Sequence, residues 1–151
     1  MLKLNLNTMF VSVFGIGFIP IASGTFGSLA GLIIGYLLNL ISNNLFFLFI
    51  PILFILGVIA SNTYQKLTGE KDSSVIVIDE VVGQLIAMMF VMDDLVLVFI
   101  SFIIFRIFDI LKPWPASYAD KKMNGGFGVM LDDVYAGIYA SILVCLIGSI
   151  L

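Results

Sequence analysis

In VIVIDEVVGQLIAMMF, residues 75–90, two carboxylates interrupt an otherwise apolar run. Similar apolar runs recur along the chain, and 61% of its 151 residues are hydrophobic while only 11% are charged. Soluble domains are roughly half apolar and a quarter charged. The composition therefore predicts an integral membrane protein, and the absence of internal repeats and linkers predicts a single domain over residues 1–151.

Five apolar segments are expected to form helices, taking about 20 residues as the length that crosses the hydrocarbon. These segments are residues 27–42, 45–65, 75–92, 94–112 and 131–151. A further apolar stretch, Met9 to Ala22, contains Gly15, Gly17 and Pro20, which favours a re-entrant or interfacial segment over a span. The predicted fold is an all-α, polytopic membrane helical bundle with about five apolar helices and this re-entrant N-terminal segment.

If the predicted helices cross the membrane in turn, all the lysines lie on the same side of it. An excess of lysine and arginine marks the cytoplasmic side of a membrane protein. They are Lys3, Lys66, Lys71, Lys112, Lys121 and Lys122. The N-terminus should then be inside and the C-terminus outside, with Asp93 and Asp94 on an outer turn. The remaining ionisable groups lie within about two helical turns of the same face: Glu70, Asp72, Asp79, Glu80, Arg106, Asp109, Asp120, Asp132 and Asp133. The polar chemistry is thus predicted to converge on one membrane face.

The acid pair Asp79 and Glu80 needs partners, because a carboxylate at the bilayer centre costs roughly 2.5 to 3.5 kcal/mol and less near the interface. A bound cation or a basic side chain could serve. The alternative is a solvated helix start whose acids complement the helix dipole. Gly83 lies near the same helical face, where it could admit a lipid phosphate, although plain packing against a neighbouring helix is the favoured role.

The segment FIIFRIFDILKPWP, residues 102–115, places Arg106, Asp109 and Lys112 at spacings of three on one helical face. Such a stripe can hold both metal and phosphate. The alternative is an ion pair between Arg106 and Asp109 with a snorkelling Lys112. The helix should end at Lys112, because a residue that precedes proline avoids the helical region.

Two further motifs contain hydroxyl or carboxylate groups beside glycines. In NGGFGVMLDD, residues 124–133, a glycine-rich turn is expected to lead into Asp132 and Asp133 at the start of the last helix. Asp132 could cap that helix or bind a hard cation, and Asp133 is the stronger ligand candidate. In SGTFGS, residues 23–28, helix amides with the hydroxyls of Thr25 and Ser28 suit a phosphate, although the same residues also describe an ordinary cap.

Missing residue types narrow the chemistry. The chain has no histidine, its only cysteine, Cys145, is not followed five residues later by arginine, and it has no Asp-x-Asp motif. Histidine-based and cysteine-based phosphatase mechanisms are therefore excluded. Magnesium held by carboxylates, with Arg106 and Lys112 offsetting phosphate charge, remains. The net charge is −3 and the sequence has no basic patch that could bind phosphates, so a nucleic-acid partner is not expected.

The motifs SGTFGS, VIDEVVGQ, FRIFDILKPWP and GGFGVMLDD, in this order and spacing, resemble the bacterial phosphatidylglycerophosphatase A family. The resemblance implies a magnesium-dependent membrane enzyme that removes the terminal phosphate of phosphatidylglycerophosphate. The site residues that the likeness suggests are Asp79, Glu80, Arg106, Asp109, Lys112, Asp132 and Asp133. Of these, we expect the metal ligands to be Asp79, Glu80, Asp109, Asp132 and Asp133. One departure is Ser23, where the family usually has proline, which weakens the expectation of a phosphate loop there.

The resulting hypothesis is a lipid phosphatase of the bacterial inner membrane whose active site faces the cytoplasm and whose substrate keeps its acyl chains in the bilayer. Asp79, Glu80, Asp109, Lys112 and Asp133 are the predicted catalytic residues, and Arg106, Lys112, Thr25 and Ser28 the predicted substrate-binding ones. The general base stays open, as does a covalent aspartyl-phosphate. The competing hypotheses are a small cation or proton transporter, and a structural subunit if the acids prove exposed and unpaired.

Overall fold

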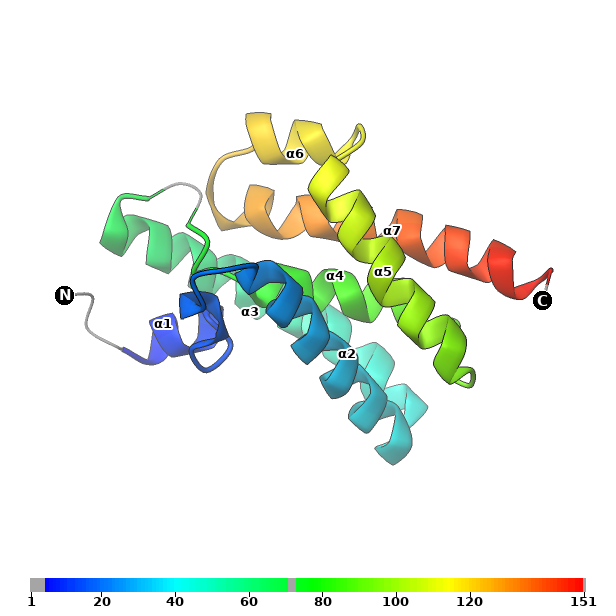
Figure 1. Cartoon of the computed structure of the whole chain (residues 1–151). Helices are drawn as coiled ribbons and strands as arrows, with labels where there is room; N and C mark the ends of the chain where they lie inside the picture. Colours follow the sequence, from blue (N-terminus) through cyan, green and yellow to red (C-terminus); the bar gives the residue numbers. More distant parts are fainter. Residues whose placement is uncertain (1–4, 71–72, 151) are drawn as a thin grey trace.

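The computed structural model describes residues 5–70 and 73–150, and every regular element within them is helical (Figure 1). The elements are α1 (Leu6–Val11), the 3-10 turn η1 (Ile16–Phe18), α2 (Ser23–Ile41), α3 (Asn43–Thr68), α4 (Ile78–Met88), α5 (Leu95–Leu111), α6 (Ala116–Lys122) and α7 (Gly125–Gly148). The prediction of an all-α membrane bundle is confirmed. Lys3, Lys71 and Asp72, which entered the charge map, lie outside the described residues.

Three helices in the described ranges are long and apolar enough to cross a membrane: α2, α3 and α7. The expected number of about five is therefore approximate. The expectation of a membrane-length helix over residues 75–92 is wrong, because α4 has only 11 residues. At about 1.5 Å per residue it is roughly 16 Å long, well short of a hydrocarbon core of about 30 Å.

The short helix α4 forms the centre of the bundle, and α2, α3, α5 and α7 pack around it (Figure 1). Every residue from Val81 to Met88 is buried. Its apolar sequence therefore reflects burial by other helices rather than contact with lipid. A helix buried by other helices and a helix in contact with lipid have the same apolar composition. The apolar run over residues 75–92 was therefore mistaken for a membrane span.

The N-terminal apolar stretch is broken, as the sequence predicts. The helix α1 ends at Val11, and positive φ angles follow at Val13, Phe14 and Gly15. The Val11 carbonyl accepts a hydrogen bond of 2.9 Å from the amide of Val77, which fastens this segment to the chain just before α4. Phe14 remains 86% exposed at the tip of the turn. The stretch is therefore no continuous span.

The segment from Pro113 to Gly128 is more ordered than predicted. The helix α5 does end before Pro113, with Lys112 in the left-handed region at φ 44°. The expected glycine-rich turn, however, is the first turn of α7, and α6 precedes it. The amide of Gly126 donates a hydrogen bond of 2.7 Å to Asn62 Oδ1 on α3, and a Cβ there would lie 2.4 Å from the Val58 carbonyl. Close packing on α3 thus extends α7 through its glycines.

Candidate metal and phosphate site

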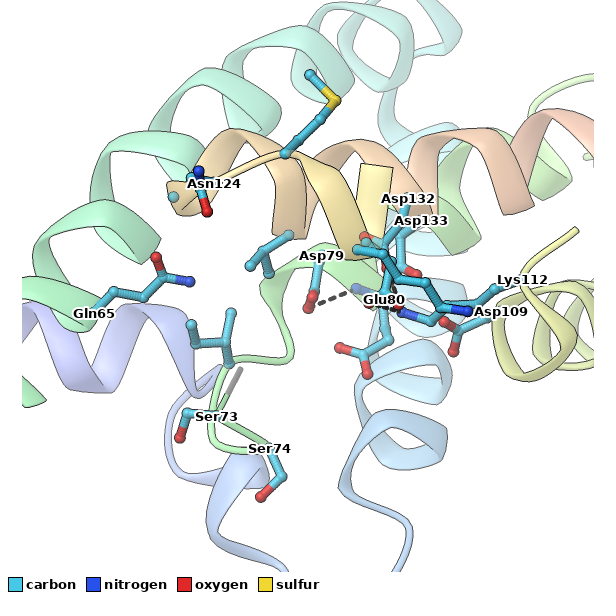
Figure 2. Close-up of a pocket in the computed structure, with 16 residues that line it drawn as sticks. Gln65, Ser73, Ser74, Asp79, Glu80, Asp109, Lys112, Asn124, Asp132 and Asp133 are labelled. Atoms are coloured by element: carbon cyan, nitrogen blue, oxygen red, sulfur yellow. Dashed lines mark hydrogen bonds and ion pairs between the residues drawn. The ribbon is translucent and has the colours of Figure 1, made fainter. Parts of the chain in front are cut away.

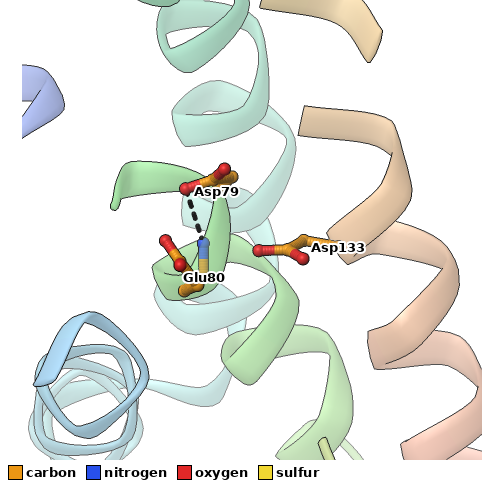
Figure 3. Close-up of side chains that lie close together, drawn as sticks. All are labelled: Asp79, Glu80 and Asp133. Carbon is orange, nitrogen blue, oxygen red and sulfur yellow. Dashed lines mark hydrogen bonds between the residues drawn. The ribbon is translucent and has the colours of Figure 1, made fainter. Parts of the chain in front are cut away.

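The centre of the site is a group of three carboxylates from two helices. Asp79 and Glu80 lie in the first turn of α4, and Asp133 projects from α7 toward them (Figure 3). Each of the three offers an oxygen within 4.8 Å of the others. Asp79 Oδ1 also accepts a hydrogen bond of 3.1 Å from the Glu80 amide, which fixes that side chain at the start of the helix. The structure therefore joins carboxylates from two sequence motifs, although Asp133 lies more than 50 residues after Asp79 and Glu80.

The carboxylates meet because α4 and α7 cross at very short range through glycine. A Cβ on Gly137 would lie 2.5 Å from the Gly83 carbonyl, and a Cβ on Gly83 would lie 2.8 Å from the Asp133 carbonyl. No real side chain fits at such distances. Gly83 therefore has the predicted packing role, and this contact brings Asp133 beside the turn that carries Glu80.

Two further carboxylates, Asp109 and Asp132, face cations. Arg106 Nη1 donates to Asp109 Oδ2 at 2.5 Å, the ion pair that the sequence offered as an alternative. Lys112 Nζ donates to Asp132 Oδ2, and also to Asp120 Oδ1 at 3.0 Å. Burial opposes the charge of Lys112, but Asp132 and Asp120 outweigh it and hold its pKa above the usual value. Lys112 therefore stays an ammonium ion throughout the neutral pH range.

Three of the predicted phosphate-binding residues, Thr25 and Ser28 on α2 and Arg106 on α5, do not lie where a phosphate in the pocket would contact them. Ser28 is fully buried, donates to the Gly24 carbonyl at 2.8 Å and accepts from Arg106 Nη1 at 3.2 Å. Neither Thr25, Ser28 nor Arg106 lines the pocket around the carboxylates. In this structure Arg106 connects α2 to Asp109, and a direct phosphate contact by these three residues stays a prediction.

Of the two roles that the sequence left open for Asp132, the helix cap is wrong. The helix α7 begins at Gly125 with Asn124 as its N-cap, so Asp132 and Asp133 lie about two turns inside it. Asp132 is only 5% exposed and Asp133 only 2%. The error has a physical source, because glycines disfavour an isolated helix and only packing on α3 extends α7 through them. Burial leaves both aspartates as groups that need a partner other than water.

The carboxylates open into a pocket of about 430 Å³ between the start of α4, the ends of α3 and α5, and the α6–α7 segment (Figure 2). Asp79, Glu80, Asp109, Lys112, Asp132 and Asp133 all line it. Polar lining residues that the sequence did not assign to the site are Gln65, Ser73, Ser74, Asp120, Lys121 and Asn124. Their signal was weak, because short polar segments between apolar runs also describe ordinary loops.

The donor atoms of the pocket suit a hard divalent cation. Glu80 Oε2, Asp132 Oδ1 and Asp133 Oδ2 are buried and have no hydrogen-bond partner within the described residues. Buried carboxylate oxygens without partners are costly, and binding of a cation removes that cost. Magnesium prefers such oxygens and keeps several waters. Asp79, Glu80 and Asp133 therefore fit the ion, whereas Asp109 and Asp132 already face Arg106 and Lys112.

These features define a polytopic helical membrane protein with a buried carboxylate site at one end of its bundle. Comparison with family models then identifies it more closely: the chain belongs to the phosphatidylglycerophosphatase A family, whose model matches residues 9–148.

Relatives support the same assignment over most of the chain. A phosphatidylglycerophosphatase A of Haemophilus influenzae is 43% identical over 87% of this chain and 82% of its own length. The phosphatidylglycerophosphatase A of Escherichia coli is 37% identical over 89% of this chain and 79% of its own length. A Bacteroides thetaiotaomicron protein, provisionally named a phosphatidylinositol-3-phosphatase, is 39% identical over 87% of this chain and 86% of its own length. No solved structure matches the chain.

Proposed function

We propose that this protein is a magnesium-dependent phosphatidylglycerophosphatase, which hydrolyses the terminal phosphate monoester of phosphatidylglycerophosphate to phosphatidylglycerol and phosphate. The observation that carries the proposal is the group of Asp79, Glu80 and Asp133 with converging oxygens, beside Lys112, at one end of an apolar bundle. Membership of the phosphatidylglycerophosphatase A family supports the reaction. The same family gives no support to the transporter hypothesis.

Asp79, Glu80 and Asp133 would hold the metal ion. When bound, magnesium would polarise the phosphoryl group and make water a better nucleophile. The requirement for it rests on the donor set, since three carboxylates with two orphaned oxygens exceed what protein cations neutralise there. The general base stays open among the carboxylates that border the pocket.

Lys112 would bind and orient the phosphate. Its ammonium group lines the pocket between Asp132 and Asp120, and the two aspartates keep it charged and fix its position. A pre-positioned cation stabilises the charge that develops on phosphoryl oxygens without reorganising during the reaction. Asp109 also lines the pocket, where Arg106 holds it through the 2.5 Å ion pair.

The active site would face the cytoplasm at the inner membrane of a bacterium. The pocket contains Lys112 and Lys121, and the positive-inside rule assigns lysine-rich ends to the cytoplasm. The lipid could then present its head group sideways while its acyl chains stay among the exposed apolar side chains of the bundle. Labelling a Lys122→Cys, Cys145→Ser variant with an impermeant maleimide tests this orientation: labelling requires broken cells if the proposal is right, and intact spheroplasts suffice if it is wrong.

The reaction is tested by measuring phosphate release from phosphatidylglycerophosphate with detergent-purified protein, in magnesium and in chelator. We expect magnesium-dependent release that is lost in Asp79→Asn, with circular dichroism and gel filtration unchanged. Phosphatidylinositol 3-phosphate should be assayed in parallel, because the Bacteroides relative is named for it. Preferential hydrolysis of that lipid would reassign the substrate, and no release from folded protein with any divalent ion would overturn the enzyme proposal.

A further inference from the structure

The pocket is larger and more acidic than one phosphate monoester requires. It has a volume of about 430 Å³, and its lining includes six carboxylates and two lysines among the residues that the structure describes. One of these, Lys112, already faces Asp132 and Asp120. A substrate with several negative charges therefore needs further positive charge. A metal ion would supply positive charge only beside its ligands Asp79, Glu80 and Asp133.

Within the described lining, the second lysine is Lys121. It lies on α6, lines the pocket, and forms no ion pair with any residue in the described part of the chain. Its neighbour Lys122 is also exposed but does not line the pocket. Successive helical residues point about 100° apart, so the helix assigns the two lysines to different surroundings.

The helix α6 has one buried face and exposed aromatic residues, as expected of a segment at a membrane interface. Ala116 and Ala119 are fully buried against the bundle, while Tyr118 is 57% exposed and Trp114, just before the helix, is 77% exposed. Tryptophan and tyrosine favour the level of the head groups at a membrane interface. Lys121 would therefore stand at the depth where the diester phosphates of phospholipids lie.

We propose that Lys121 is a specificity-determining residue that binds the phosphodiester of the lipid substrate, while the terminal monoester occupies the site at Lys112 and the acid group. This inference rests on the proposed function. Phosphatidylglycerophosphate has both groups, joined through one glycerol, whereas phosphatidate has only a monoester attached to the same diacyl backbone. Lys121 would thus select lipids that have a second phosphate between the scissile group and the acyl chains.

The test compares Lys121→Gln, Lys121→Arg and the matched control Lys122→Gln in mixed micelles at constant surface charge. Loss of one charge-assisted contact should raise the KM for phosphatidylglycerophosphate in Lys121→Gln about fivefold to tenfold, with kcat within about twofold. Lys121→Arg should retain most of the affinity, and Lys122→Gln should resemble the wild type. In Lys121→Gln the affinity for phosphatidate should change less than twofold. That affinity is measured as KM if phosphatidate is cleaved and as a competitive Ki if it is not.

Three results would overturn the inference: an unchanged KM in Lys121→Gln, equal KM changes in Lys121→Gln and Lys122→Gln, or an equal effect on phosphatidate. Failure of the proposed function looks different, because the wild-type protein would then release no phosphate from phosphatidylglycerophosphate at all.

Discussion

Apart from the exposed Asp120, the acids that line the pocket form two groups in different surroundings. Asp79, Glu80 and Asp133, the unpaired group, face no lysine or arginine ion-pair partner within the described residues. Asp109 and Asp132, the paired group, each face a cation, Arg106 and Lys112. The difference indicates which carboxylates are available to a metal ion and which position protein cations. Neighbouring residues on one helix, Asp132 and Asp133, fall on opposite sides of this division.

The largest expected effect separates those two neighbours. Asp133→Asn should lower turnover by roughly a thousandfold, because it removes an anionic ligand from the unpaired group. Asp132→Asn should cost clearly less, since it leaves that group intact and weakens only the hold on Lys112. Phosphate release across a magnesium titration measures both, and only Asp133→Asn should need more magnesium for half-maximal activity. Equal losses with equal magnesium dependence would remove the distinction between the groups.

The next effect comes from the cation of the paired group. Lys112→Met should lower kcat/KM by roughly a hundredfold and also lower thermal stability, because Asp132 is then buried without its partner. The double variant Lys112→Met, Asp132→Asn removes the stranded charge, so it should recover stability without recovering activity. Thermal melts in detergent and phosphate release give the two readouts. Recovery of activity in the double variant would show that Lys112 only neutralises Asp132.

The smallest effect concerns α7, the helix that carries one member of each group. Asn62→Ala removes the side-chain acceptor of the Gly126 amide and should lower the free energy of unfolding by about 1 kcal/mol, with kcat nearly unchanged. Asn124→Ala is the matched control for stability, because Asn124 makes no side-chain cap hydrogen bond to the same helix. Its melting temperature should equal that of the wild type. Equal melting temperatures for both variants would deny Asn62 the capping role.

Much of the site could be predicted from the sequence because charges inside apolar runs are costly. Asp79, Glu80, Asp109 and Asp133 stood out for that reason, and the structure places all four at one pocket. Lys121 did not stand out, since a lysine in a polar segment between helices has many ordinary uses. Arg106 was assigned to phosphate, whereas its contacts are with Asp109 and Ser28 inside the bundle.

The class of the protein, its helical content and its unusually placed charges were predictable from the sequence, because they follow from composition and from local hydrophobic pattern. Three features became visible in the folded chain alone: α4 is a short central helix, α7 begins at its glycines, and Asp109 and Asp132 face cations. Each of these depends on contacts between residues far apart in the chain. Close approach at Gly83 and Gly137 brings Asp133 to Glu80, and no local pattern contains that distance.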